Sequence, residues 1–258
     1  FLFIDFGLYN GTISYSEVVS LSYTAMLFSI FKDIMAVLFP KYCLGCTQII
    51  GDNLPFLCVN CRHELRQTHF DTLPDSENPM IKKFWGKVSV EKAAALLYYE
   101  KGTVSQRLIH ALKYHNREQV GLWLGQWYAC ELAQSHYFQG VELVIPVPLH
   151  PKKKKKRGYN QVTLFAREIA AQLQVPYIED ILIKQQYNSA QAKKHWLERQ
   201  KSSKEQFILK DTTTIAGKHI LLVDDIVTTG ATLTQCATLL IGAGAKVSFA
   251  CMAYSNDE

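Results

Sequence analysis

The sequence of 258 residues has no long uninterrupted hydrophobic run. Its most apolar stretch, residues 21–39, is marginal in length for a bilayer span and contains Lys32 and Asp33, whose charges are costly inside a membrane. No stable membrane span is therefore expected. An amphipathic helix that packs on the following residues is the favoured interpretation, with membrane association as the alternative. A secretory signal with a basic start and a small-residue cleavage site is also absent, so we expect a cytoplasmic protein.

Signatures of several common enzyme classes are missing as well. No Gly-x-x-x-x-Gly-Lys-[Ser/Thr] loop is present, which excludes a P-loop nucleotide site. The glycines Gly242 and Gly244 follow an expected helix instead of opening one, so they form no dinucleotide-binding fingerprint. The order of residues supports no Ser-His-Asp triad.

The excess of positive charge is confined to one segment of the sequence. Lys and Arg number 28 and Asp and Glu 23, a formal net charge of +5, and six of the basic residues form the run 152–157. Without this run the balance is 22 minus 23, or −1. The basicity is therefore local, and the composition excludes a protein that attracts nucleic acid with its whole surface.

The seven cysteines fall into two groups. Four of them form two Cys-x-x-Cys pairs separated by 11 residues: Cys43, Cys46, Cys58 and Cys61. Two such pairs place four thiolates at tetrahedral distances, which predicts a closed, structural zinc site. Two redox-active pairs or reduced core cysteines are the alternative, but nothing around either pair resembles a βαβ redox site. Cys130, Cys236 and Cys251 lie in apolar segments and are interpreted as small core residues.

A regular alternation of strand and helix patterns begins near Glu91. Extended segments are predicted at 93–99, 143–147, 177–183, 220–223 and 246–253, and helices at 103–114, 119–136, 162–173 and 233–240. Such alternation predicts an α/β domain with a mainly parallel sheet that helices cover on both faces.

The patterns divide the chain into four parts. We expect an N-terminal extension with the amphipathic helix at 1–40, a zinc ribbon at 41–67, a polar, turn-rich linker at 68–90 and the α/β domain at 91–258. Residues 1–25 carry no clear pattern and receive no function. Because the chain does not begin with methionine, we interpret it as a fragment or as extended upstream of a start such as Met26.

The strongest signal for a ligand site lies at 220–232. Four apolar residues bring a strand to its C-terminal end, where Asp224 and Asp225 follow. A short loop then opens a helix and contains Thr228, Thr229, Gly230, Ala231 and Thr232. The free amides at a helix N-terminus favour phosphate, and glycine allows the backbone to approach it closely. Since acids do not bind phosphate, we expect them to face a ribose diol, with or without magnesium nearby.

Residues 220–232 resemble the phosphoribosyl-pyrophosphate (PRPP) signature of type I phosphoribosyltransferases. The resemblance implies that Asp224 and Asp225 hold the ribose hydroxyls and that residues 228–232 cradle the 5′-phosphate. Three further stretches, 112–114, 145–150 and 157–161, and the double-cysteine ribbon are similar to the ComF family of competence-associated phosphoribosyltransferase-like proteins. This second resemblance covers residues 26–258.

The resemblance implies a type I phosphoribosyltransferase-like α/β fold preceded by a small zinc ribbon, with structural Zn²⁺ and with Mg²⁺ bound alongside PRPP. Pro146 and Val147 follow a predicted strand, where type I enzymes place their pyrophosphate-binding loop. Arg157 is favoured as a cation for this loop because residues 158–160 fix it at the start of a helix. Most of the five lysines at 152–156 are interpreted as solvated. Non-specific attraction to DNA has little support, because no aromatic residues interleave with them.

The long polar segment 187–207 is interpreted as a lid that closes over the reacting sugar, with a helical surface hairpin as the alternative. ComF proteins carry a Gln and then an Arg in this region, which we match to Gln191 and Arg199. Arg199 therefore joins Asp224 and Asp225 as a catalytic candidate.

Three functions are open at this point. The first is a phosphoribosyltransferase that moves the phosphoribosyl group of PRPP to an unnamed nitrogen acceptor. The second is a PRPP or nucleotide sensor without turnover. The third is a protein whose zinc ribbon contacts single-stranded DNA or a helicase. The ComF resemblance implies a role in natural competence and DNA uptake for each of them.

Overall fold

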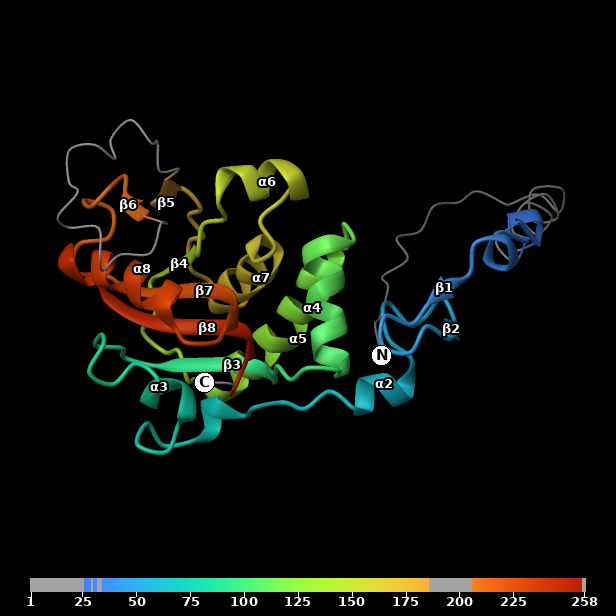
Figure 1. Ribbon diagram of the computed structural model, residues 1–258, viewed down its shortest axis with the longest axis horizontal. Coiled ribbons are helices and arrows are strands. Elements are labelled where there is room, and N and C mark those ends of the chain that lie inside the picture. The colour runs from blue at the N-terminus through green and yellow to red at the C-terminus, as the bar shows by residue number, and fades with distance from the viewer. Residues whose placement is uncertain (1–25, 29, 32–33, 186–205, 257–258) are drawn as a thin grey trace, which may run out of the picture.

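The computed structural model describes residues 26–28, 30–31, 34–185 and 206–256 (Figure 1). Its elements in chain order are β1 (Lys41–Tyr42), β2 (Ile49–Ile50), α2 (Val59–His63), the 3₁₀ turn η1 (Phe70–Thr72), α3 (Pro79–Lys82), β3 (Ala93–Tyr98), α4 (Val104–Tyr114), α5 (Gln119–Ser135), β4 (Leu143–Pro146), α6 (Pro151–Arg157), α7 (Thr163–Leu173), β5 (Leu182–Gln185), β6 (Gln206–Leu209), β7 (His219–Val227), α8 (Ala231–Gly242) and β8 (Lys246–Tyr254).

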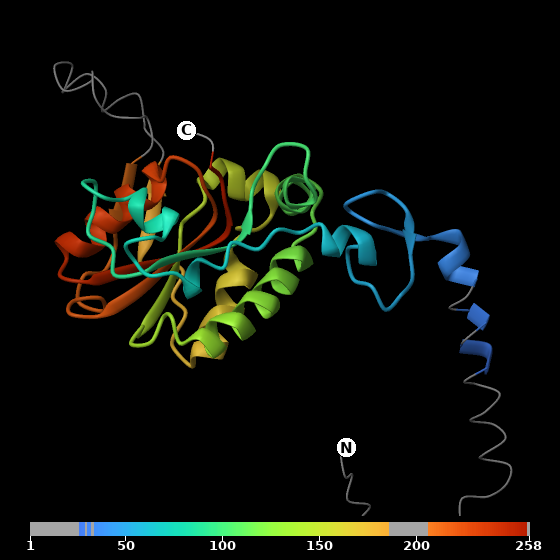
Figure 2. The same cartoon turned by 90° about the horizontal axis from the view of Figure 1, so that it is seen from below.

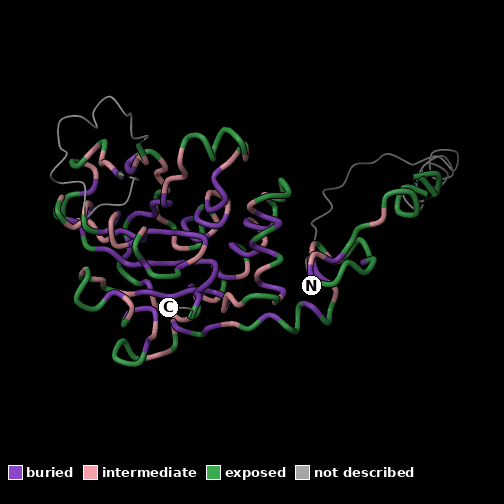
Figure 3. Tube along the Cα trace, viewed as in Figure 1, coloured by how far each residue is buried: buried purple, intermediate pink, exposed green. Residues whose placement is uncertain are grey.

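The core is a parallel sheet with the strand order β3-β8-β7-β4. Two helices, α5 and α7, cover one face, while α3 and α8 lie on the other (Figures 1 and 2). Because both faces are covered, the strands are nearly continuous runs of buried apolar residues (Figure 3). The predicted α/β class, with a mainly parallel sheet between helices, is confirmed.

Most expected elements lie where the periodicity predicted them, but β7 is longer. We predicted a strand at 220–223 with the two acids after its end, whereas β7 continues to Val227. The reason is its pairing: β4 stops at Pro146, opposite Val223, while β8 follows β7 as far as the pair Val227–Tyr254. Asp224 and Asp225 therefore lie inside a strand, just beyond the point where β4 ends.

Two expectations about packing are wrong. Residues 26–28, 30–31 and 34–38 are helical, but their apolar side chains are exposed and do not pack on the cysteine-rich residues that follow. Cys130 is also exposed on α5, whereas Cys236 and Cys251 are buried as predicted. No helix in the described ranges is long and apolar enough to cross a membrane.

The segment 68–90, proposed above as a linker, packs against the sheet through η1 and α3. Asn78 is completely buried and fastens it there. Its Oδ1 accepts hydrogen bonds from the amides of Met80 and Ile81 at 2.9 and 3.2 Å, which caps α3. Its Nδ2 donates to the carbonyls of Phe70 and Ala93 at 3.0 and 2.8 Å, which ties the segment to β3.

Candidate functional site

Four cysteine sulfurs meet in the small unit formed by β1, β2 and α2, called here the cysteine module (residues 41–67). The sulfur atoms of Cys43, Cys46, Cys58 and Cys61 all lie within 4.8 Å of one another. The Cys46 and Cys58 sulfurs are 3.7 Å apart. A tetrahedral zinc site with Zn–S bonds of about 2.3 Å separates its sulfurs by about 3.8 Å, so the donor set and its spacing fit a metal ion.

Backbone amides of the module favour the thiolate form of one cysteine. The amides of Gly45 and Cys58 each donate to the Cys43 sulfur at 3.3 Å. Although burial acts to raise it, these amide hydrogen bonds lower the pKa of the Cys43 thiol to about 6. A thiolate is the form that binds metal. A Cβ at Gly45 would lie 2.6 Å from the Cys61 sulfur, so only glycine fits beside the cluster.

The two acids of β7 form the most buried charged cluster at the edge of the sheet. Asp224 and Asp225 are only 9% and 7% exposed. An oxygen of Asp225, Oδ2, is 2.9 Å from the Lys113 ammonium of α4 and accepts a hydrogen bond from the Gln161 amide at 2.6 Å. Oδ1 of Asp224 accepts from the Asp225 backbone amide at 2.8 Å. Three segments far apart in the sequence therefore converge on this pair.

The environment of the pair changes its acidity. Burial, and then the neighbouring charge of Asp225, raise the pKa of Asp224 to about 8. Asp224 consequently keeps its proton near neutral pH, while Asp225 faces the Lys113 ammonium. A ligand that brings a cation or donates hydroxyl hydrogen bonds offsets the cost of ionising Asp224.

This acidity makes the stability of the protein depend on pH. Asp224 binds its proton more tightly in the folded state, with a pKa of about 8, than at its ordinary pKa of 3.8. Between these two pKa values the folded state therefore holds a proton that the unfolded state has released. Because of this proton, the free energy of unfolding falls as the pH rises through that window. Asp224→Asn removes the titration. Urea unfolding at about pH 5 and about pH 8 should show a smaller loss of stability in the variant than in the wild type. An equal loss in both would contradict the assignment.

The loop after β7 leads directly into the N-terminus of α8, beside the acids. Gly230 has φ of 76°, and α8 begins after it without a side-chain cap. A Cβ on Gly230 would lie 2.6 Å from the Phe84 ring, so both its conformation and its surroundings require glycine. Thr228 and Thr229 are exposed. The loop is open to solvent at a helix N-terminus, which is an arrangement suited to an anion.

The end of β4 forms the other side of this edge. The Val147 amide donates to the Val223 carbonyl at 2.8 Å, and the Val147 carbonyl accepts from the Asn160 side chain at 3.0 Å. Pro146 is the last residue of β4, so Pro146 and Val147 lie next to β7 where the acids follow. The Oδ1 atom of Asn160 is buried and has no protein partner in the part of the chain that is described.

The basic run is a helix and not a loop. Pro151 begins α6, the His150 ring accepts from the Lys152 amide at 3.1 Å, and Gly158 ends the helix in the left-handed conformation. Arg157 therefore ends a helix, whereas we expected it at the start of one. Its guanidinium donates to Gln161 Oε1 and lies 5.6 Å from the centre of the Tyr114 ring.

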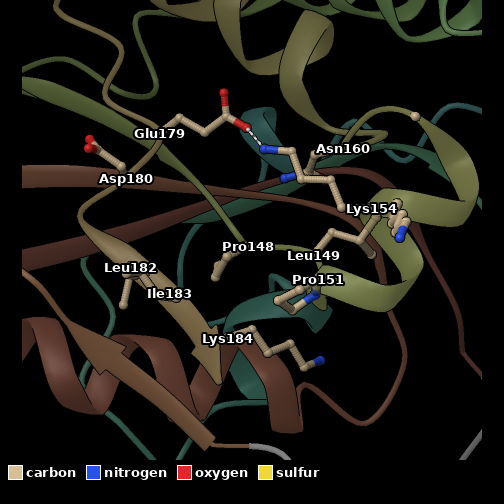
Figure 4. Close-up of a pocket in the computed structure, with 12 residues that line it drawn as sticks. Pro148, Leu149, Pro151, Lys154, Asn160, Glu179, Asp180, Leu182, Ile183 and Lys184 are labelled. Atoms are coloured by element: carbon tan, nitrogen blue, oxygen red, sulfur yellow. Dashed lines mark hydrogen bonds and ion pairs between the residues drawn. The ribbon is translucent and has the colours of Figure 1, made fainter. Parts of the chain in front are cut away.

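A cavity of about 720 Å³ opens between α6 and β5 (Figure 4). Pro148, Leu149 and Pro151 line one side and Leu182 to Lys184 the other. Lys154 and Glu179 point toward each other across it, with their charged atoms 3.2 Å apart.

The structure brings together some of the predicted site residues, while others are not among the residues that it describes. The acids, residues 228–232, Pro146 and Val147 share one edge of the sheet, and Arg157 reaches them through Gln161. Gln191 and Arg199 lie outside the described residues. Lys113 and Gln161 received no role from the sequence, although both belong to stretches that carried the family resemblance. Only the fold shows that they contact Asp225.

Comparisons with known proteins agree with this architecture. The chain carries a phosphoribosyltransferase domain: the family described as "Phosphoribosyl transferase domain" matches residues 163–258. DNA utilization protein YhgH of Escherichia coli O157:H7 is 30% identical over 144 residues, which cover 54% of this chain and 61% of that protein. Competence protein F of Haemophilus influenzae is 30% identical over 42% of this chain and 47% of its own length. Competence protein ComFC of Streptococcus pneumoniae is 35% identical over 40% and 43%.

Over about half of its length the chain is a distant homologue of these DNA-utilization and competence proteins, which agrees with the resemblance stated from the sequence. The alignments span less than two thirds of the length of these relatives.

Proposed function

We propose that this protein binds PRPP with Mg²⁺ at the edge formed by Asp224, Asp225 and the N-terminus of α8, and that it transfers the phosphoribosyl group to a nitrogen acceptor. The observation that carries the proposal is the convergence of a buried acid pair and an uncapped helix N-terminus on one edge of a parallel sheet. In open α/β sheets, ligands bind at the carboxyl ends of the strands.

Each part of the edge suits one part of PRPP. Asp224 and Asp225 accept hydrogen bonds from the two ribose hydroxyls. Residues 228–232 supply backbone amides and threonine hydroxyls to the 5′-phosphate. The loop after Val147 and the guanidinium of Arg157 face the pyrophosphate, where Arg199 adds a second cation from the segment 187–207. Bound Mg²⁺ neutralises charge on the pyrophosphate.

The reaction replaces the bond from C1 of the ribose to the pyrophosphate oxygen with a bond from C1 to the acceptor nitrogen. Pyrophosphate leaves with the electron pair of the broken bond, and the nitrogen loses a proton to solvent. Positive charge develops on the sugar ring as the bond breaks, so acceleration comes mainly from positioning and from neutralising the leaving group. The four cysteines hold structural Zn²⁺ and take no part in this step.

The setting of this activity follows from the relatives, which are named for DNA utilization and for competence. We propose that this protein also serves in the uptake or use of DNA.

Calorimetric titration of Mg–PRPP into the zinc-loaded full chain tests the proposal. We expect one site per chain with a Kd in the micromolar range, about −8 kcal/mol. Mg–pyrophosphate and ribose 5-phosphate serve as controls and should each bind more weakly, because each engages only one half of the edge. Absence of PRPP binding to well-folded protein would exclude both transfer and sensing. Binding without pyrophosphate release across a panel of nucleobases and amines would support a sensor instead of an enzyme.

A further inference from the structure

Lys113 belongs to the stretch 112–114 that carried the family resemblance, and the proposed function gives it no role. It lies in the last turn of α4, where its ammonium is 2.9 Å from Oδ2 of Asp225. The neighbouring Leu112 is completely buried, and its carbonyl accepts a hydrogen bond from the Tyr159 hydroxyl. This part of α4 is therefore fixed beside the acid pair, both by the core and by the turn that follows α6.

The carboxylate of Asp225 already has three donors from the protein. Its Oδ1 is turned toward the backbone of β7, where it accepts from the Ile226 amide at 2.6 Å. Its Oδ2 accepts from the Gln161 side chain and also faces the Lys113 ammonium. Because a carboxylate oxygen accepts about two hydrogen bonds, a ribose hydroxyl that binds Oδ2 must displace one of these two partners.

The two partners of Oδ2 differ in how firmly they are held. Gln161 is buried, and its Oε1 accepts from the Arg157 guanidinium. The Lys113 side chain is 21% exposed and carries its ammonium on a flexible four-carbon stem. Removing that ammonium alone would leave a buried carboxylate without its counter-charge, and a hydroxyl donor offsets part of the cost. Lys113 is therefore the partner that a ribose hydroxyl can displace.

A place for the displaced ammonium lies on the side of Lys113 that faces α6. A cavity of about 580 Å³ opens there between the two helices, and five cations line it: Lys113, Lys153, Lys155, Lys156 and Arg157. Among the described residues, no acidic side chain lines this cavity. Because Arg157 faces the pyrophosphate in the proposed function, the Lys113 ammonium lies between a carboxylate that suits ribose and a basic cavity that suits the leaving group.

We propose that Lys113 exchanges partners when PRPP binds: its ammonium leaves Asp225, whose Oδ2 then accepts from a ribose hydroxyl, and it binds the pyrophosphate beside Arg157. This inference rests on the proposed function and adds a pyrophosphate-binding residue to it.

The exchange links the two halves of the ligand. A molecule with pyrophosphate but no ribose draws Lys113 away and leaves Asp225 without a replacement donor. A molecule with ribose but no pyrophosphate displaces Lys113 without giving it a new anion. A ligand that carries both groups satisfies both side chains, and Lys113 is then in place to neutralise the pyrophosphate as that group takes the electron pair of the breaking bond.

Calorimetric titration of Mg–pyrophosphate, ribose 5-phosphate and Mg–PRPP into the zinc-loaded full chain tests the exchange. Lys113→Met should weaken Mg–pyrophosphate and Mg–PRPP at least about tenfold, as expected for the loss of one charged hydrogen bond. Ribose 5-phosphate should bind as tightly as to the wild type or more tightly, because its competitor for Asp225 is gone. Lys113→Arg keeps the charge and should restore most of the pyrophosphate affinity. Lys101→Met is the matched control: it removes the same charge at an exposed position before α4 and should leave all three affinities unchanged.

A lysine that stays on Asp225 in the complex would give a different pattern. Lys113→Met would then weaken ribose 5-phosphate at least as much as Mg–pyrophosphate, and this result would overturn the exchange while PRPP binding to the wild type upheld the proposed function. Unchanged affinity for Mg–pyrophosphate in the variant would also overturn it. Absence of Mg–PRPP binding to the wild type would reject the proposed function and the exchange together. Circular dichroism checks the fold of the variant, and Lys113→Gln, which can still donate to Asp225, replaces it if the methionine variant unfolds, with the same expected pattern.

Discussion

Replacement of both Asp224 and Asp225 by asparagine is expected to weaken Mg–PRPP binding by at least about 100-fold. Bound Mg–PRPP is expected to ionise Asp224 as well as to face Asp225. Hydrogen bonds to a charged group contribute roughly 1.5–3 kcal/mol each, so losing two carboxylate acceptors costs about 3–6 kcal/mol. The fold should survive, because asparagine keeps the shape of each side chain. It also retains an oxygen that can accept from the backbone amides of Asp225 and Ile226, which donate to these carboxylates in the wild type. Calorimetric titration of the variant measures the loss.

The control for this result must remove the same charge elsewhere. Glu64→Gln with Asp75→Asn takes two negative charges from exposed positions, one of them in a surface ion pair with Lys92. Such pairs contribute little to stability, so this variant should bind Mg–PRPP like the wild type. Unchanged affinity in the Asp224 and Asp225 variant would remove the acids from the ligand site and leave the proposed function without its main support.

Removal of the metal is expected to unfold the cysteine module and leave the α/β domain folded. The module has two strands of two residues and one helix of five, and much of its buried surface belongs to Cys43, Ile50, Leu57 and Cys61. Units of this size lack a sufficient core, and structural zinc contributes roughly 10–16 kcal/mol to the folding of comparable peptides. The sheet has its own core and needs no metal.

Tryptophan fluorescence follows this change. The Phe56 ring of the module lies 5.9 Å from the Trp123 ring of α5, and this contact is lost when the module unfolds. A chelator should shift the emission of the wild type and expose the module to protease, while the main thermal transition moves by only a few degrees. Trp123→Phe should abolish most of the shift. Cys43→Ser should reproduce the chelated state, and Cys130→Ser, at an exposed position, should not. A single cooperative loss of all structure would show that the two parts fold as one unit.

Local pattern was sufficient to predict the architecture. The helices α4, α5, α7 and α8 have buried residues at helical spacing, and each of the strands β3, β4, β7 and β8 contains an apolar run. The end of β7 was not predictable in this way, because pairing with β8 carries the strand past the apolar run.

Long-range contacts explain what the sequence did not reveal about the site. Lys113 lies in the last turn of an amphipathic helix and Gln161 precedes another, and neither position carries a local pattern that points to an acid in β7. The basic run shows the same limit. Five consecutive lysines have no amphipathic period, and the helix α6 depends on His150 and Pro151 at its start and Gly158 at its end.

The contact between Phe84 and Gly230 bears on how this protein can be divided. Phe84 belongs to the segment between the cysteine module and the sheet, and its ring packs against Gly230 at the start of α8. Asn78 holds that segment on β3. A shortened chain that begins at Glu91, where the strand and helix alternation starts, would therefore keep residues 228–232 and lose the ring that packs against Gly230. The smallest fragment able to reproduce the proposed ligand site therefore includes η1 and α3. A domain boundary placed at Glu91 from the sequence alone would remove both.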